Sequence, residues 1–184
     1  MVFFLIGYMG AGKTTIGKLL AKKLNWQFID VDSFIENRYH QTITAIFEKR
    51  GECGFRELER RTLEEISNFE NVVISTGGGL PCFFDNMDLM NRKGVTIYLK
   101  SSAEDLINRL NTERQSRPLI RGKSIEELQY FVETNLEKRE PFYNKSQLIF
   151  DVKNCSSKKE MNCWVEEIFV TLLRDISIGE KKQD

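Results

Sequence analysis

A glycine-rich segment near the beginning of the chain, residues 7–15, has the residue types and spacing of a phosphate-binding loop. It contains Gly-Tyr-Met-Gly-Ala-Gly-Lys-Thr-Thr, which fits the pattern G-x-x-x-x-G-K-[ST]. Glycines in such a loop let backbone N–H groups turn inward and bind an anion. We expect Lys13 to reach the β- and γ-phosphates of a nucleotide and the Thr14 hydroxyl to ligate Mg²⁺. The predicted nucleotide-binding residues are Gly10, Ala11, Gly12, Lys13, Thr14 and Thr15.

The segments on either side of this loop have the patterns that a phosphate-binding loop requires. Residues 2–6 are an apolar run that predicts a buried strand. Residues 15–24 place their apolar side chains on one face of a helix, whose N-terminal dipole would point at the phosphate. The alternative is a glycine-rich turn between a strand and a helix that binds nothing, and the two flanking elements argue against it.

Asp30 ends a short predicted strand at residues 26–30, and Asp32 lies two residues further on. Because side chains alternate along a strand, the spacing of two would put both carboxylates on the same side at its carboxyl end. One carboxylate could hold metal-bound water, and the other could accept a proton from a substrate hydroxyl or orient it. Alternatively, Asp32 could cap the next helix.

Three consecutive glycines follow Thr76 at the end of a predicted buried strand, residues 72–76. Without side chains, Gly77, Gly78 and Gly79 would let a ligand approach the backbone and accept hydrogen bonds from its N–H groups. The alternative is a flexible turn without a ligand.

Arg56 begins a predicted helix, residues 55–69, after a predicted turn at residues 51–54. The dipole at a helix N-terminus opposes a cation, so Arg56 needs an anionic partner. That partner could be a substrate carboxylate or one of the neighbouring acids, Glu57 and Glu59.

Two further arginines lie in the second half of the chain. Arg117 belongs to a polar, irregular segment, residues 111–123, which we expect to form a lid that excludes water. An arginine on a lid can neutralise charge on a transferred phosphoryl group, and Arg109 and Arg114 could assist it. Arg139 lies at the end of a predicted helix that Pro141 is expected to stop. At that position it could serve only as a favourable cation at the negative end of the helix dipole.

The whole chain has the size and patterning of one α/β domain. Its 184 residues include 27 Lys and Arg and 27 Asp and Glu, so its net charge of zero argues against a general nucleic-acid binder. Strands alternate with helices, which predicts a parallel sheet covered on both faces. We expect one domain over residues 1–178 and a disordered tail at residues 179–184. His40 is expected on the surface.

The cysteines and the apolar segments bear on location. The four cysteines have no metal-binding spacing and are expected to be reduced thiols. The apolar run near the beginning is too short for a signal peptide, and no segment is long enough to span a membrane. These features predict a cytoplasmic protein.

Taken together, the motifs resemble those of shikimate kinase, a small P-loop kinase with the nucleoside monophosphate kinase fold. The resemblance covers more than four-fifths of the chain, up to about Asp151. It rests on six motifs in order, at residues 7–15, 30–32, 54–59, 76–79, 117–119 and 139–143. It implies a three-layer P-loop NTPase fold with a five-stranded parallel sheet in the order 2-3-1-4-5 and a mobile lid.

The resemblance also implies ligands and roles. It implies ATP-dependent phosphorylation of the shikimate 3-hydroxyl, a step toward chorismate and the aromatic amino acids, by a monomer that uses Mg²⁺. Asp32 would be the base, Lys13 and Arg117 would stabilise the transferred phosphoryl group, and Asp30 would support the metal through water. The residues implied to hold shikimate are Asp32, Arg56, Gly77, Gly78, Gly79 and Arg139.

Two rival functions remain at this point. Another small-molecule kinase of this fold, such as a gluconate kinase, would share the loop and a lid. A catalytically silent nucleotide-binding module would have no need to keep Asp32, Arg56, Arg117 and Arg139 together. The residues that contact adenine, expected near residues 153–155, stay open because no motif residue occurs there.

Overall fold

The structure is a computed structural model that describes residues 1–153 and 158–180. A single parallel sheet with the strand order β2-β3-β1-β4-β5 lies at its centre, as the resemblance implied. The strands are β1 (Val2–Ile6), β2 (Gln27–Asp30), β3 (Val72–Ser75), β4 (Val95–Lys100) and β5 (Leu148–Asp151). Every residue of β1 and β3 is buried, as expected for central strands covered on both faces.

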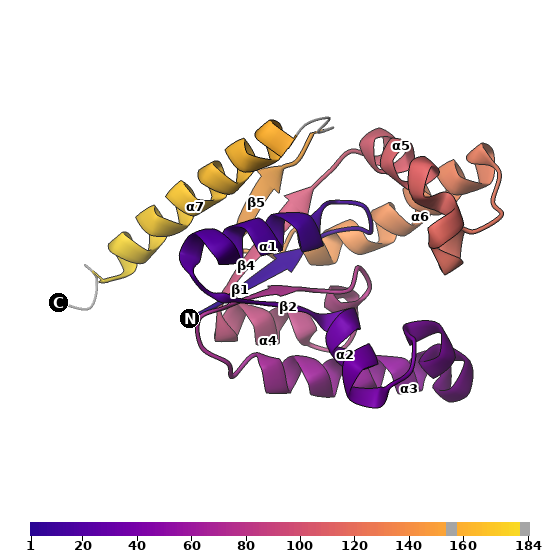
Figure 1. Cartoon of the computed structure of the whole chain (residues 1–184), viewed down its shortest axis with the longest axis horizontal. Coiled ribbons are helices and arrows are strands. Elements are labelled where there is room, and N and C mark those ends of the chain that lie inside the picture. Colours follow the sequence, from indigo (N-terminus) through magenta and orange to yellow (C-terminus); the bar gives the residue numbers. More distant parts are fainter. Residues whose placement is uncertain (154–157, 181–184) are drawn as a thin grey trace.

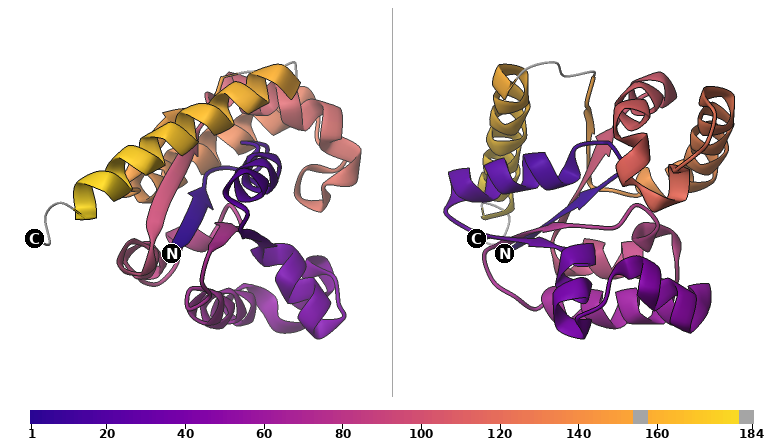
Figure 2. Two further views of the ribbon diagram at one scale, coloured as in Figure 1. Left: turned by 60° about the vertical axis from the view of Figure 1, so that its left-hand side comes forward. Right: turned by 45° about the vertical axis from the view of Figure 1, so that its right-hand side comes forward.

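Helices cover both faces of the sheet and extend beyond the carboxyl ends of its strands. The helices are α1 (Lys13–Leu24), α2 (Val31–Tyr39), α3 (Ile43–Ile66), α4 (Asn86–Lys93), α5 (Ala103–Glu113), α6 (Ile125–Tyr143) and α7 (Lys158–Glu180), and the short 3₁₀ turns are η1 (Leu80–Cys82), η2 (Arg114–Ser116) and η3 (Pro118–Ile120). Helices α1 and α7 lie on one face, and α3 and α4 lie on the other (Figure 1, Figure 2). Ligands of such sheets bind beyond the carboxyl ends of the strands.

The helix that contains Arg56 begins earlier than predicted. The turn expected at residues 51–54 is instead a kink inside α3, where Gly51 alone has non-helical angles (φ 67°, ψ −179°). A second helical segment begins after this kink, so Arg56 lies in the first turns of that segment, a few residues beyond the N-terminal position that was predicted for it. The apolar side chains of Phe55, Leu58, Leu63 and Ile66, which recur at helical spacing along this segment, are all buried.

Two other predicted helix ends also differ. Helix α6 continues through Pro141 to Tyr143, so the predicted stop at this proline was wrong. Helix α7 extends to Glu180, so the first two residues of the predicted disordered tail are helical. The rest of that tail, residues 181–184, lies outside the described residues.

The predicted lid is partly helical. Helix α5 extends into it as far as Glu113, and η2 and η3 occupy much of its remainder. In the described part of the chain, no helix has both the length and the apolar character to cross a membrane.

Gly94 and Gly122 allow the cost of close packing at a glycine to be compared with the cost of a positive φ angle. A methyl group at Gly94 would lie 2.2 Å from the Val2 carbonyl oxygen, whereas one at Gly122 would meet nothing within 4 Å but would sit at a φ of +76°. We expect Gly94→Ala to lower the free energy of unfolding by roughly 3 kcal/mol through overpacking, and Gly122→Ala by about 1 kcal/mol through backbone strain.

Urea denaturation of the two variants and the parent protein measures this difference. An equal loss in both variants would contradict the close packing of Gly94 against β1.

Candidate active site

The phosphate-binding loop joins β1 to α1 as predicted. Gly10 and Gly12 have φ angles of 81° and 92°, which glycine adopts without strain. Gly12 is the N-cap residue of α1, and no side chain caps this end of the helix. The first backbone N–H groups of α1 are therefore available to an anion at the N-terminus of the helix.

Lys13 is buried within this loop. Its ammonium donates hydrogen bonds to the carbonyl oxygens of Gly7 (2.8 Å) and Tyr8 (2.9 Å). Burial lowers the pKa of Lys13 to about 8, although Asp32 and Asp30 favour the charged form. The charge is therefore held in place by the backbone of the loop and can exchange these carbonyls for phosphate oxygens.

Asp30 and Thr14 lie together at the carboxyl end of β2. The Thr14 hydroxyl donates to the Asp30 carboxylate at 2.9 Å, and the same carboxylate accepts a hydrogen bond from the Ser33 backbone N–H at 3.3 Å. Asp30 is thus the N-cap residue of α2, and the alternative that Asp32 caps this helix was wrong. The pair supplies only oxygen donors, which suit Mg²⁺. No group of three or more His, Cys, Asp or Glu side chains suited to a metal occurs among the described residues.

Asp32 lies in the first turn of α2 and not on the strand. The alternation of side chains along a strand therefore does not apply to Asp32, yet its carboxylate and that of Asp30 are close enough to interact. Burial and, to a smaller extent, the charge of Asp30 raise the pKa of Asp32 to about 6, against the effect of Lys13. A carboxylate that titrates near neutrality is suited to accept a proton.

The glycine turn after β3 brings the predicted substrate residues together. A methyl group added to Gly77 would lie 3.1 Å from carboxylate oxygens of both Asp32 and Glu59. One added to Gly78 would lie 3.3 Å from an Arg139 guanidinium nitrogen, and one added to Gly79 would lie 2.9 Å from Arg56. The absence of side chains therefore lets two guanidinium groups and two carboxylates reach this turn.

Arg56 has a buried partner in Glu59. These side chains form an ion pair at 2.5 Å, and Glu52 accepts a second, longer hydrogen bond at 3.3 Å. Only 2% of the Glu59 side chain is exposed, and burial raises its pKa to about 7, against the effect of Arg56. Of the two neighbouring acids considered as partners, the structure selects Glu59. The Arg56 Nε atom is buried and has no hydrogen-bond partner among the described residues.

Glu59 was not predicted to belong to the site itself. Its place beside Asp32 and the glycine turn results from packing of α3 against α2 and η1. The sequence signal that could have found it is the i, i+3 spacing of Arg56 and Glu59 on one helix.

Arg139 and Tyr143 project from the last turns of α6. The Tyr143 hydroxyl donates to the Gly78 carbonyl, and the nearby Arg139 partly offsets the rise that burial causes in the pKa of Tyr143. The Arg139 guanidinium lies 5.3 Å from the centroid of the Tyr8 ring. Arg139 thus connects α6 to the glycine turn and to the phosphate-binding loop.

The arginines of the predicted lid and the neighbouring Arg109 have partners outside the glycine turn. Arg117 donates two hydrogen bonds to Glu113, and 37% of its side chain is exposed. Arg109 donates to the carbonyls of Gly10 (3.1 Å) and Lys153 (2.6 Å), and Arg114 donates to a carbonyl within the lid. Of the residues expected near adenine, 154 and 155 lie outside the described residues.

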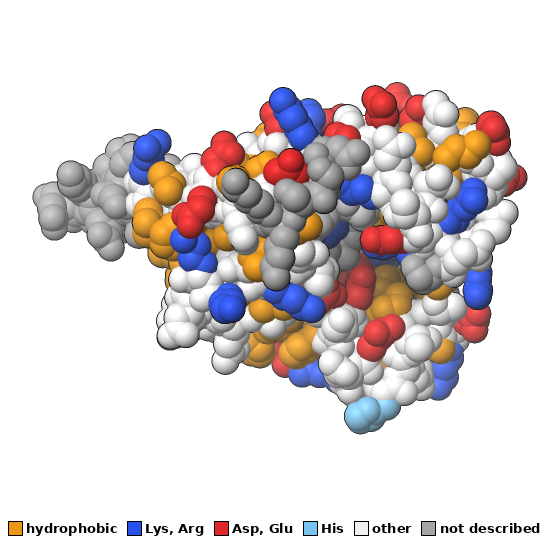
Figure 3. Space-filling model, turned by 45° about the horizontal axis from the view of Figure 1, so that its top comes forward, with side chains coloured by type: hydrophobic (Ala, Val, Ile, Leu, Met, Phe, Trp, Pro, Cys, Tyr) orange, Lys and Arg blue, Asp and Glu red, His pale blue; other side chains and the backbone are white. Residues whose placement is uncertain are grey.

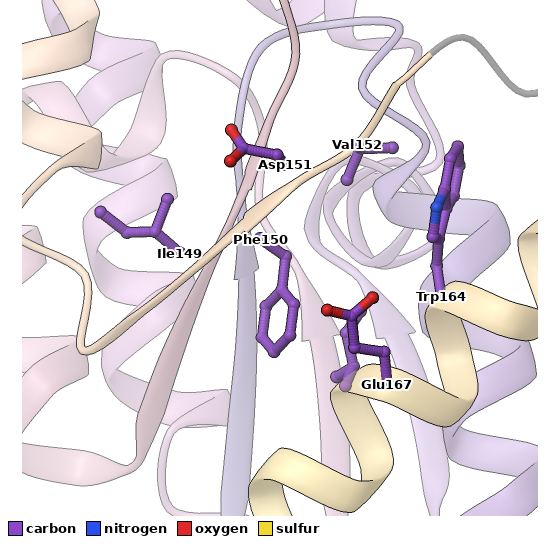
Figure 4. Close-up of a pocket in the computed structure, with 7 residues that line it drawn as sticks. Ile149, Phe150, Asp151, Val152, Trp164 and Glu167 are labelled. Carbon is purple, nitrogen blue, oxygen red and sulfur yellow. The ribbon is translucent and has the colours of Figure 1, made fainter.

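The surface is hollowed beside the site. The face in Figure 3 shows a depression with acidic and hydrophobic side chains within it. A cavity of about 300 Å³ adjoins Thr14 and Asp30. Another, of about 220 Å³, lies between β5 and α7, where Trp164 and Glu167 face the strand (Figure 4), and none of the predicted site residues lines it.

The fold and the site together define a P-loop kinase. The strand order and the loop before α1 belong to that class, and a carboxylate that titrates near neutrality lies close to the buried lysine of the loop.

Comparison with known proteins identifies the family. A family model described as shikimate kinase matches residues 9–176. The shikimate kinase of Azobacteroides pseudotrichonymphae genomovar. CFP2 is 56% identical over 166 residues, which are 90% of this chain and 95% of the relative. That of Parabacteroides distasonis is 52% identical over 159 residues, 86% of this chain and 92% of the relative.

Solved structures agree with this assignment. The crystal structure of shikimate kinase from Bacteroides thetaiotaomicron matches with a TM-score of 0.91 at 49% identity, covering 94% of this chain and 98% of that chain. Shikimate kinase from Acinetobacter baumannii in complex with shikimate matches with a TM-score of 0.81 at 30% identity, covering 95% and 93%. The chain therefore belongs to the shikimate kinase family and is an enzyme of that family, which confirms the resemblance of its motifs.

The raised pKa of Asp32 predicts a pH-dependent cost to folding. Because its pKa in the folded protein (about 6) exceeds its ordinary value of 3.8, the ionised carboxylate opposes folding once the pH rises through this interval. We expect Asp32→Asn to raise the free energy of unfolding at pH 8 by roughly 1–3 kcal/mol and to change it little at pH 4.

The measurement is urea denaturation of the free protein at both pH values. Asp88→Asn, at an exposed position of α4, is the control and should show no such gain. A gain for Asp32→Asn that is equal at both pH values would contradict a buried, ionised Asp32.

Proposed function

We propose that the protein transfers the γ-phosphoryl group of ATP to the 3-hydroxyl of shikimate at the carboxyl ends of β1, β2 and β3. The observation that carries this proposal is the convergence of Asp32, Arg56 and Arg139 on the bare backbone of residues 77–79. A small hydroxylated carboxylic acid requires cations for its carboxylate and an acceptor for its hydroxyl proton, and these are the groups that converge there.

In the proposed substrate complex, the two arginines bind the shikimate carboxylate. The buried Arg56 Nε–H has no hydrogen-bond partner among the described residues, and an unpaired buried donor is costly unless a ligand accepts its hydrogen bond. The backbone of Gly77, Gly78 and Gly79 lies against the hydroxylated cyclohexene ring of shikimate. Asp32 accepts hydrogen bonds from its hydroxyls.

Phosphoryl transfer then needs few chemical steps. Asp32 takes the proton of the 3-hydroxyl, the resulting oxygen forms a bond to the γ-phosphorus, and the bond to the β,γ-bridging oxygen breaks to release ADP. Lys13 leaves the two loop carbonyls that it now contacts and stabilises charge on the phosphates. Arg117 leaves Glu113 and does the same from the lid.

The metal and the location complete the proposal. Thr14 and Asp30 would hold Mg²⁺, Thr14 through its hydroxyl and Asp30 through water, and the ion would offset charge on the β- and γ-phosphates. A monomer that works in the cytoplasm is the expectation from the resemblance. The free thiols of Cys53, Cys82 and Cys163 support a reducing compartment.

The direct test is ADP release from Mg²⁺-ATP with shikimate, with gluconate, and with neither. We expect release that depends on shikimate alone. Release with gluconate only would keep the kinase and reject the roles of Arg56 and Arg139. No stimulation by either acid, in a protein that binds ATP, would indicate a silent nucleotide-binding module.

The proposed carboxylate contacts predict a selective defect. Arg56→Ala or Arg139→Ala removes one of two charge-assisted partners, each worth about 1.5–3 kcal/mol, so KM for shikimate should rise roughly 10- to 100-fold. KM for ATP should change far less. Steady-state kinetics with each substrate varied in turn measures both constants, and equal effects on the two would count against the assignment.

The proposed role of Lys13 predicts loss of turnover without loss of the fold. Lys13→Ala should lower kcat by at least about 1,000-fold, since it removes a cation aimed at the transferred phosphoryl group. Because burial of the charged Lys13 is unfavourable, the free energy of unfolding of the variant should be no lower than that of the parent. Lys18→Ala, at an exposed position of the same helix, is the control. Near-normal kcat in Lys13→Ala would refute the proposed mechanism.

A further inference from the structure

Each arginine of the proposed carboxylate site lies against an aromatic ring that none of the motifs assigns to the site. The Arg56 guanidinium carbon lies 4.1 Å from the centroid of the Phe83 ring, and that of Arg139 lies 5.3 Å from the centroid of the Tyr8 ring. Both distances are within the range in which a cation is attracted to an aromatic ring.

The Phe83 ring restrains the Arg56 guanidinium, whose hydrogen bonds involve only some of its nitrogen atoms. Glu59 and Glu52 accept hydrogen bonds from its two terminal nitrogens, which leaves Nε without a partner among the described residues. Phe83 directly follows η1 and so belongs to the same segment as the glycine turn. One segment therefore supplies both the bare backbone and a ring that limits the orientation of Arg56.

The ring beside Arg139 comes from the phosphate-binding loop. Tyr8 is only 1% exposed, and its backbone carbonyl accepts a hydrogen bond from Lys13. Its hydroxyl is buried and has no hydrogen-bond partner among the described residues, so the contact with Arg139 is made without a hydrogen bond from the hydroxyl. Tyr8, a variable position of the loop motif, thus lies between the phosphate-binding loop and the proposed carboxylate site.

We propose that Tyr8 and Phe83 are positioning residues, which hold Arg139 and Arg56 in the orientation that binds the substrate carboxylate. A guanidinium pairs with a carboxylate through two parallel hydrogen bonds, which fixes the orientation that the arginine must hold. Restraint before binding lowers the conformational entropy that the substrate must overcome. This inference rests on the proposed roles of the two arginines.

The test is steady-state kinetics of Tyr8→Leu and Phe83→Leu, which remove the rings. Partly buried contacts of this kind are worth enough to raise KM for shikimate by about 3- to 30-fold, while kcat and KM for ATP should stay within about threefold. Restoring the ring type should restore KM, so Tyr8→Phe and Phe83→Tyr should lie within about twofold of the parent.

Phe84→Leu is the matched control, because Phe84 adjoins Phe83 but is 62% exposed, and it should match the parent. Should Tyr8→Leu fail to fold, Tyr8→Met takes its place, since its longer, unbranched side chain adapts to the space of the ring without being aromatic. Calorimetric titration of each folded variant with shikimate should show the same rise in Kd as in KM.

Three results would overturn the inference. One is an unchanged KM for shikimate in both Leu variants. Another is a loss in Tyr8→Phe as large as in Tyr8→Leu, which would assign the effect to the hydroxyl. The third is a fall in kcat with KM unchanged. All are distinct from failure of the proposed function, which would appear as a parent enzyme that shikimate does not stimulate.

Discussion

Burial of opposite charges around the glycine turn is the constraint on which the rest of the structure depends. Asp32 and Glu59 are carboxylates whose pKa values burial raises, and removing such groups from water is costly unless cations lie close by. Arg56 and Arg139 can come close only because residues 77–79 have no side chains. The sheet has to hold this turn rigidly, since a displacement would leave buried charges unpaired.

Much of this arrangement could be predicted from the sequence because it depends on local patterns. The spacing of glycines and lysine in the loop predicts its backbone, and the alternation of strands and helices predicts a parallel sheet. The strand order came from the resemblance, and the observed order agrees with it. Residues of the separate motifs meet because the carboxyl ends of parallel strands share one edge.

The errors arose where tertiary packing overrides a local signal. Gly51 has an angle that ends a helix, and a second helical segment starts directly beyond it, earlier than predicted, because its first turns bury Phe55 and Leu58 against the core. Pro141 removes one N–H group, but α6 continues to Tyr143, whose hydroxyl bonds the glycine turn. The short spacing of the two aspartates near residue 30 could not reveal that a helix begins between them.

The cations of the site differ in how firmly their partners hold them, and this difference matches their proposed roles. Arg56 and Glu59 form a buried pair, which is costly to break and so suits a fixed contact to the substrate. Arg117 pairs with Glu113 at a partly exposed position, where an ion pair is worth at most about 1 kcal/mol. Lys13 donates hydrogen bonds to two neutral carbonyls. A phosphate can therefore attract Arg117 and Lys13 away from their present partners, while Arg56 stays in place. The substrate is then positioned before the charges on the nucleotide are neutralised.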